Sequence, residues 1–130
     1  KENEDANGNI RSMDNIYMNG PEIYAFTLRG VPDLIEKTLI KNNTTMDQID
    51  YVILHQANKL VLESLREKLE IPAEKYCIDV EDIGNTVSST IPIALRRSID
   101  RNIPQVKSGN KILIAGFGVG YSLGATVITV

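Results

Sequence analysis

Short apolar runs alternate with amphipathic segments through most of the chain. The run Tyr51–Leu54 is apolar at every position, which is typical of a strand buried on both faces of a sheet. Residues 59–69 place leucine and valine at helical spacing with charged residues between them, and this period predicts an amphipathic helix. Similar spacing predicts an earlier helix over about 22–41 and a later one over about 88–102, the latter capped by a serine at 88 or 89.

Further strands are predicted at 76–80, 111–115 and 122–130. Helices between successive strands indicate the α/β class, with a mixed, mostly parallel sheet flanked by helices. The last two strands are separated only by the glycine-rich turn 116–120, which is too short for a crossover, so we expect them to pair antiparallel. Residues 1–15 are polar and show no period, and we expect a loop there.

Composition narrows the class of protein. The chain has 130 residues, a net charge of −3 and no basic stripe, which argues against a nucleic-acid partner. It has no apolar run long enough for a membrane span, and since its opening is polar and acidic we expect no signal peptide. A single cysteine fits the reducing cytoplasm. The opening is acidic and lacks an initiator Met, so we interpret the sequence as a segment excised from a longer protein.

The residues most suited to catalysis or ligand binding lie directly after the predicted strands. His55 follows the strand 51–54, Asn85 follows 76–80, and the glycine-rich turn follows 111–115. Parallel strands bring their carboxyl ends to one edge of a sheet, where ligands bind, so His55 and Asn85 are expected to converge. The N-terminus of the following helix opposes protonation of His55. A neutral imidazole and a carboxamide would then present two donors to an oxyanion or enolate, beside a backbone N–H of the glycine turn.

Other interpretations of these residues stay open on the sequence alone. His55 could cap a helix, Asn85 could be an ordinary turn residue, and the glycines could form only a tight turn. A dinucleotide site is excluded because a strand, and not a helix, follows the glycines. One histidine and one cysteine are too few soft ligands for a metal site, so we expect no metal.

The motifs together resemble the C-terminal half of β-ketoacyl-acyl carrier protein synthase III. The resemblance covers about residues 17–130, with 1–16 left as a polar N-terminal loop. It rests on His55-Gln56-Ala57-Asn58, Gly84-Asn85-Thr86, Ser88-Ser89-x-x-Pro92-x-Ala94-Leu95, Gly116-Phe117-Gly118-x-Gly120 with Gly124-Ala125, and Asn19 to Phe26.

The resemblance implies one half of a thiolase-like fold, usually in a homodimer, with no metal or redox cofactor. It implies a Cys-His-Asn triad in which His55 and Asn85 are the second and third members. The Cys nucleophile would lie in the missing N-terminal half and take an acyl group from acyl-CoA. Malonyl-acyl carrier protein would then lose CO₂, while His55 and Asn85 stabilise the enolate of this fatty acid synthesis step. The chain alone is expected to be inactive.

The resemblance also implies residues that bind the substrates. Asn58 would contact the pantetheine arm, the backbone N–H near Val119 would complete an oxyanion hole, and Gly20 would line the tunnel mouth. The remaining substrate-binding candidates are Gln56, Ala57 and Gly118.

Some positions depart from the family pattern. Ala25 and Leu60 stand where a basic residue is common, and Val119 and Leu123 differ from the usual residues of the glycine loop. These departures keep two alternatives open. One is a starter-unit or polyketide-type ketosynthase of secondary metabolism, and the other is a non-catalytic thiolase-like binding domain.

Overall fold

The computed structural model describes residues 3–12, 14, 17–118 and 120–130. The larger elements are joined by short 3-10 turns at Met46–Gln48, Ala73–Lys75 and Val87–Ser89. In chain order the helices and strands are β1 (Asn3–Glu4), β2 (Ile10–Arg11), α1 (Gly20–Lys41), β3 (Tyr51–Leu54), α2 (Lys59–Lys68), α3 (Thr90–Asp100), β4 (Lys111–Gly118) and β5 (Ser122–Thr129).

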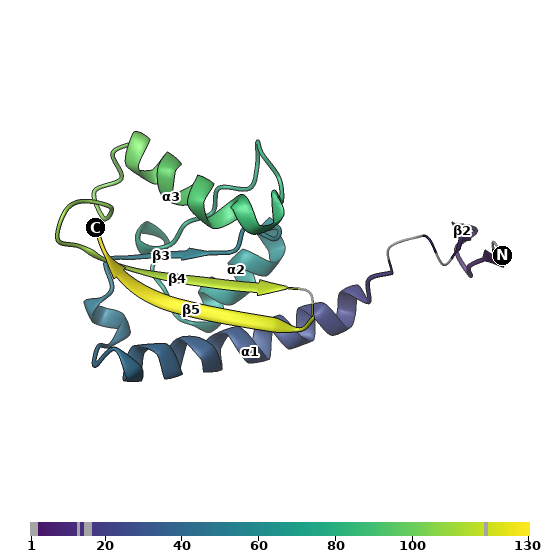
Figure 1. Cartoon of the computed structure of the whole chain (residues 1–130), viewed down its shortest axis with the longest axis horizontal. Coiled ribbons are helices and arrows are strands. Elements are labelled where there is room, and N and C mark those ends of the chain that lie inside the picture. The colour runs from purple at the N-terminus through teal and green to yellow at the C-terminus, as the bar shows by residue number, and fades with distance from the viewer. Residues whose placement is uncertain (1–2, 13, 15–16, 119) are drawn as a thin grey trace.

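The sheet that carries the fold has three strands in the order β3-β4-β5. β3 and β4 are parallel, and β4 and β5 are antiparallel, as the sequence predicts. Figure 1 shows α3 on one face of this sheet and α1 on the other. The helices precede, follow and connect the strands and pack on both faces of a sheet with parallel and antiparallel pairs (Figure 1), so the α/β class and the mixed sheet are confirmed.

Side-chain alternation along β3 separates two cores. Val52 and Leu54 point toward α1 and α2, where they join Val31 and Leu62 in one buried cluster. Tyr51 and Ile53 point the other way, where Ala94 of α3 covers them, and they form the second cluster. All four residues of β3 are buried. A fully buried aliphatic side chain stabilises the fold by about 1.5–3 kcal/mol. The apolar run therefore holds β3 between the two helix layers that cover the faces of the sheet.

α1 is one continuous helix although Gly30 and Pro32 lie inside it. It begins at Gly20, earlier than the pattern predicts, and the Asn19 side chain accepts a bond from the Glu22 backbone N–H at 3.4 Å. A Cβ on Gly30 would lie 2.7 Å from the Leu123 side chain of β5. The glycine therefore lets the helix cross close to the sheet, which offsets its low helix propensity.

Three sequence predictions of secondary structure are wrong in detail. Residues 76–80 form no strand but only one parallel bridge, between Tyr76 and Val52. β4 continues to Gly118, because Gly116 and Gly118 pair with Gly124 and Ser122 of β5 and so belong to the sheet. The polar N-terminal region contains the short antiparallel pair β1–β2, held by the Asp5 carboxylate, which accepts from the backbone N–H groups of Asn7 and Asn9.

Candidate active site

His55 lies at the carboxyl end of β3. Its backbone N–H donates to the carbonyl of Ala115 at 2.9 Å, which extends the parallel pairing one residue beyond the strand. Nδ1 of the ring lies 2.7 Å from Oγ1 of Thr90, the first residue of α3. The ring also meets Phe117 of β4 edge to face, with centroids 5.3 Å apart and planes at 80°. Groups from β3, α3 and β4 thus fix the position of the imidazole.

The imidazole is half-buried, and burial lowers the pKa of His55 below its ordinary value. The ring is therefore neutral at pH 7, with one N–H donor and one acceptor nitrogen. The sequence also indicates a neutral ring, but from the dipole of the following helix. The cause that the structure gives is removal from water.

Asn85 is exposed in the loop that precedes α3, directly after Gly84, whose φ of 65° is left-handed. Its Oδ1 accepts from the backbone N–H of Val87 at 2.8 Å. This bond uses the oxygen of the carboxamide and orients the group. Its NH₂ group is left to donate to a ligand.

A chain of polar contacts links the two candidate residues. The backbone N–H of Val87 donates to Asn85, its carbonyl oxygen lies 3.1 Å from the Thr90 hydroxyl, and that hydroxyl contacts His55. Within the described part of the chain, no direct hydrogen bond joins His55 and Asn85. The structure therefore joins them through the loop 85–90, and a direct convergence of their side chains stays a prediction.

Val87, at the centre of this chain, has a strained backbone. Its φ is 58°, in the left-handed region that β-branched residues rarely adopt, and 73% of the residue is exposed. A residue held there costs about 1–3 kcal/mol, and such outliers concentrate at functional sites. Packing does not explain the strain, because the side chain points into solvent, whereas both of its peptide groups serve the candidate site.

Gln56 was expected to contact the substrate, but it is fully buried. Its Nε2 donates to the carbonyl of Leu54 at 2.7 Å, and its Oε1 accepts from the backbone N–H of Asp79 at 2.7 Å. Both ends of the amide are thus used within the protein, so the structure does not support direct substrate contact. The side chain instead ties the end of β3 to the segment around Asp79.

Asp79 extends this support to α3. Its carboxylate is 6% exposed and lies 2.8 Å from Nε of Arg97 and 2.7 Å from Arg101. Both arginines are on the last turns of α3 or directly after it. Gln56 and Asp79 together therefore connect the strand that carries His55 to the helix that carries Thr90. The sequence showed no signal for this pairing, because 22 residues separate Asp79 and Arg101.

Asn58 and Ala57 lie between His55 and α2. Asn58 is exposed and is the N-cap of α2, where its Oδ1 accepts from the Val61 backbone N–H at 2.9 Å. This bond leaves its NH₂ group as a donor for a ligand. The backbone N–H of Ala57 donates to the His55 carbonyl at 2.9 Å, so the chain turns tightly away from the strand. Asn58 therefore follows directly after this turn, three residues beyond His55 in the sequence.

Gly118 and Gly20 lie at the same end of the molecule. Gly118 ends β4 and pairs with Ser122. Gly20 is exposed at the start of α1, and Figure 1 shows that start extending beyond the tip of the β4–β5 hairpin. Tyr121 at the tip stacks on Phe26 of α1, with centroids 4.5 Å apart. Val119, expected to supply an oxyanion-hole N–H, lies outside the described residues.

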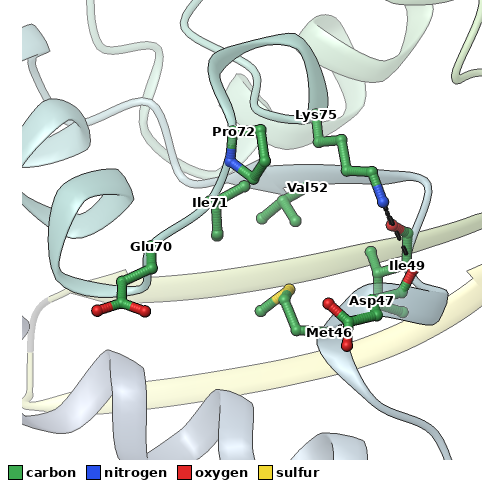
Figure 2. A pocket seen from close by; sticks show the side chains of 8 residues that line it. All are labelled: Met46, Asp47, Ile49, Val52, Glu70, Ile71, Pro72 and Lys75. Carbon is green, nitrogen blue, oxygen red and sulfur yellow. Dashed lines mark hydrogen bonds between the residues drawn. The ribbon is translucent and has the colours of Figure 1, made fainter.

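A separate cavity of about 140 Å³ opens near the other end of β3 (Figure 2). It lies beside Met46 and Ile49, which precede β3, whereas His55 follows the strand. The Lys75 ammonium donates to the carbonyl of Ile49 at 3.0 Å at its margin. This cavity is therefore distinct from the site around His55.

Two further features bear on the kind of site. Across the described ranges, no three or more His, Cys, Asp or Glu side chains are grouped so that they could hold a metal ion. In the same part of the chain, no helix combines the length and apolar character of a membrane span.

Comparison with solved structures defines the class first: this is a thiolase-like α/β fold of the condensing enzymes. A crystal structure of a 3-oxoacyl-(acyl-carrier-protein) synthase III superposes on the whole chain with a TM-score of 0.92 and 40% identity, over 38% of its own length. A priming β-ketosynthase of the R1128 polyketide pathway superposes on 88% of the chain with a TM-score of 0.81 and 26% identity, over 34% of its length.

Sequence comparison then gives the family. The model of the 3-oxoacyl-[acyl-carrier-protein] synthase III C-terminal family matches residues 39–130. The chain belongs to this family. A β-ketoacyl-[acyl-carrier-protein] synthase III of Trichodesmium erythraeum is 42% identical over 112 residues, which are 86% of this chain and 33% of that protein. The chain therefore spans about a third of the length of the curated relatives it matches.

Proposed function

We propose that this chain is the C-terminal part of a 3-oxoacyl-[acyl-carrier-protein] synthase III and supplies the histidine and asparagine of its active site. The observation that carries the proposal is the neutral His55 at the end of β3, linked through Thr90 and Val87 to the loop that orients Asn85. The reaction is the decarboxylative Claisen condensation of acyl-CoA with malonyl-acyl carrier protein in fatty acid synthesis.

The geometry suits stabilisation of an enolate. Loss of CO₂ from the malonyl thioester leaves negative charge on the thioester oxygen, and neutral donors aimed at that oxygen lower the barrier. Asn85 has its NH₂ group left to donate, because its oxygen is bonded to Val87. His55, neutral and fixed by Thr90 and Phe117, supplies the second donor. The enolate carbon then attacks an acyl group held on a cysteine, which releases the thiolate.

The remaining parts of the enzyme complete the proposal. The N-terminal half of the same polypeptide provides the Cys nucleophile, and this chain alone does not turn over. Asn58, Ala57, Gly118 and the backbone N–H of Val119 bind the thioester and its pantetheine arm, and Gly20 borders the entrance. The whole protein is a cytoplasmic homodimer that uses acyl-CoA and malonyl-acyl carrier protein and needs no bound cofactor.

The test uses the full-length protein with His55→Ala or Asn85→Ala. We expect decarboxylation of malonyl-acyl carrier protein to fall about 10²–10³-fold for either variant, the range seen when one oxyanion donor is removed. Acylation of the cysteine by acyl-CoA should persist, because it does not need the enolate donors. Asn7→Ala, which removes an exposed carboxamide in the β1–β2 hairpin, is the matched control. Normal decarboxylation in the His55→Ala protein would overturn the assignment.

A starter-unit ketosynthase of secondary metabolism is the second candidate. Leu60 favours it, because it is 66% exposed in the first turn of α2 and offers no charge to a CoA phosphate or a carrier protein. Rates with short acyl-CoA donors and with acyl-carrier-protein donors separate the two functions. A wild-type protein that neither decarboxylates nor condenses any of these substrates would leave only the non-catalytic binding domain.

A further inference from the structure

Thr90 is a buried polar residue whose side chain contacts the His55 ring. It is 1% exposed and is the first residue of α3. Its Oγ1 lies 2.7 Å from Nδ1 of His55 and 3.1 Å from the carbonyl oxygen of Val87. The hydroxyl has one hydrogen, so it can donate to only one of these two neighbours.

The two choices give His55 opposite tautomers. If the hydroxyl donates to Val87, Nδ1 must carry the imidazole proton, and Nε2 is then a lone-pair acceptor. If the hydroxyl donates to His55, Nδ1 is the acceptor and the proton is on Nε2. Only the second tautomer offers an N–H on the side of the ring away from Thr90.

Two observations favour donation to His55. The carbonyl of Val87 already accepts the backbone N–H of Thr90, which ends the 3-10 turn, so it has a partner without the hydroxyl. The contact to Nδ1 is also the shorter of the two, 2.7 Å against 3.1 Å, and is within the usual range for a hydroxyl donor.

We propose that Thr90 is a positioning residue that donates its hydroxyl hydrogen to Nδ1 of His55 and thereby holds the imidazole proton on Nε2, where it faces the substrate. The value of this tautomer for catalysis depends on the enolate role proposed above, whereas the tautomer itself does not. With Nδ1 protonated instead, the Nε2 lone pair would repel the enolate oxygen. Phe117 assists by packing across the ring and limiting its rotation.

The first measurement is the tautomer, read from long-range proton–nitrogen correlations of the full-length protein labelled with ¹⁵N-histidine. His55 is the only histidine of these 130 residues, and its signals are identified by their absence in the His55→Gln variant. We expect a protonated Nε2 and an unprotonated Nδ1 in the wild type. Thr90→Val should populate both tautomers, and Thr90→Ser should restore the wild-type spectrum.

The second measurement is steady-state kinetics of the same proteins. We expect Thr90→Val to lower kcat about three- to tenfold with little change in KM, the effect of one neutral hydrogen bond, and Thr90→Ser to recover most of the loss. Thr38→Val is the matched control, because Thr38 is also buried and its hydroxyl donates to Leu34 within α1.

The outcomes separate this inference from the proposed function. A wild-type His55 with its proton on Nδ1, or a Thr90→Val protein with an unchanged tautomer and unchanged kcat, overturns the role of Thr90 but leaves the enolate role of His55 to be judged by His55→Ala. Full activity in His55→Ala overturns the proposed function, while the nitrogen spectra still decide whether Thr90 sets the tautomer.

Discussion

Gln56→Leu tests whether a buried side chain holds the end of β3 in place. Leucine has a similar size but cannot donate to the Leu54 carbonyl or accept from the Asp79 backbone N–H, and both of these bonds are 2.7 Å long. A buried polar group that loses its partner costs about 1–3 kcal/mol, and the apolar burial of leucine offsets part of that. We expect the free energy of unfolding to fall by roughly 2–4 kcal/mol.

Urea unfolding with matched slopes measures this change, and amide hydrogen exchange locates it. The Asp79 backbone N–H should be protected in the wild type and exchange rapidly in the variant. Gln105→Leu is the control, since Gln105 is half-buried and its side chain makes no hydrogen bond within the described residues. A loss below about 0.5 kcal/mol, or an Asp79 amide that stays protected, would refute the reasoning.

Two further predictions concern charge. Asp79→Asn should lower the free energy of unfolding by about 1–3 kcal/mol, because it removes the buried carboxylate that pairs with two guanidinium groups. Asp100→Asn removes only an exposed ion pair and should cost under about 0.5 kcal/mol. Urea unfolding of the two variants compares these losses. The lowered pKa of His55 means that the unfolded chain takes up a proton first as pH falls below 6.5. Stability should decline from there toward the folded pKa, and His55→Gln should flatten that part of the profile measured between pH 7 and 5.

The order and type of the main elements could be predicted from the sequence because hydrophobic periodicity determines them. Tyr51–Leu54 is the clearest case, with the predicted bounds confirmed. The predicted strand at 76–80 failed for a specific reason. Only the Cys77 N–H bonds to β3, through the Val52 carbonyl, while Gln56 takes the Asp79 N–H that a strand would have used. The hydrophobic period of residues 76–80 does not show that a side chain takes the place of a hydrogen bond between strands.

The sequence predicted the main residues of the candidate site, but it did not predict the residues that hold them in position. His55 and Asn85 stand out because their motifs are distinctive and because strand ends collect ligand-binding groups. Thr90 was missed: a serine at 88 or 89 was expected to cap the helix, yet Ser89 makes no side-chain cap bond and the hydroxyl one residue later contacts His55. A rotation of one residue in a 3-10 turn decides which hydroxyl faces the ring, and pattern analysis does not reach that resolution.

The contacts of His55 with Thr90, Ala115 and Phe117 have a consequence for how the molecule folds. Thr90 is 35 residues away along the chain, and the other two lie beyond the last crossover. Pairing of that kind requires closure of long loops, which is slow and comes with global collapse. The imidazole environment therefore does not exist in any early, locally ordered species, and its spectroscopic signature reports the arrival of the complete native topology.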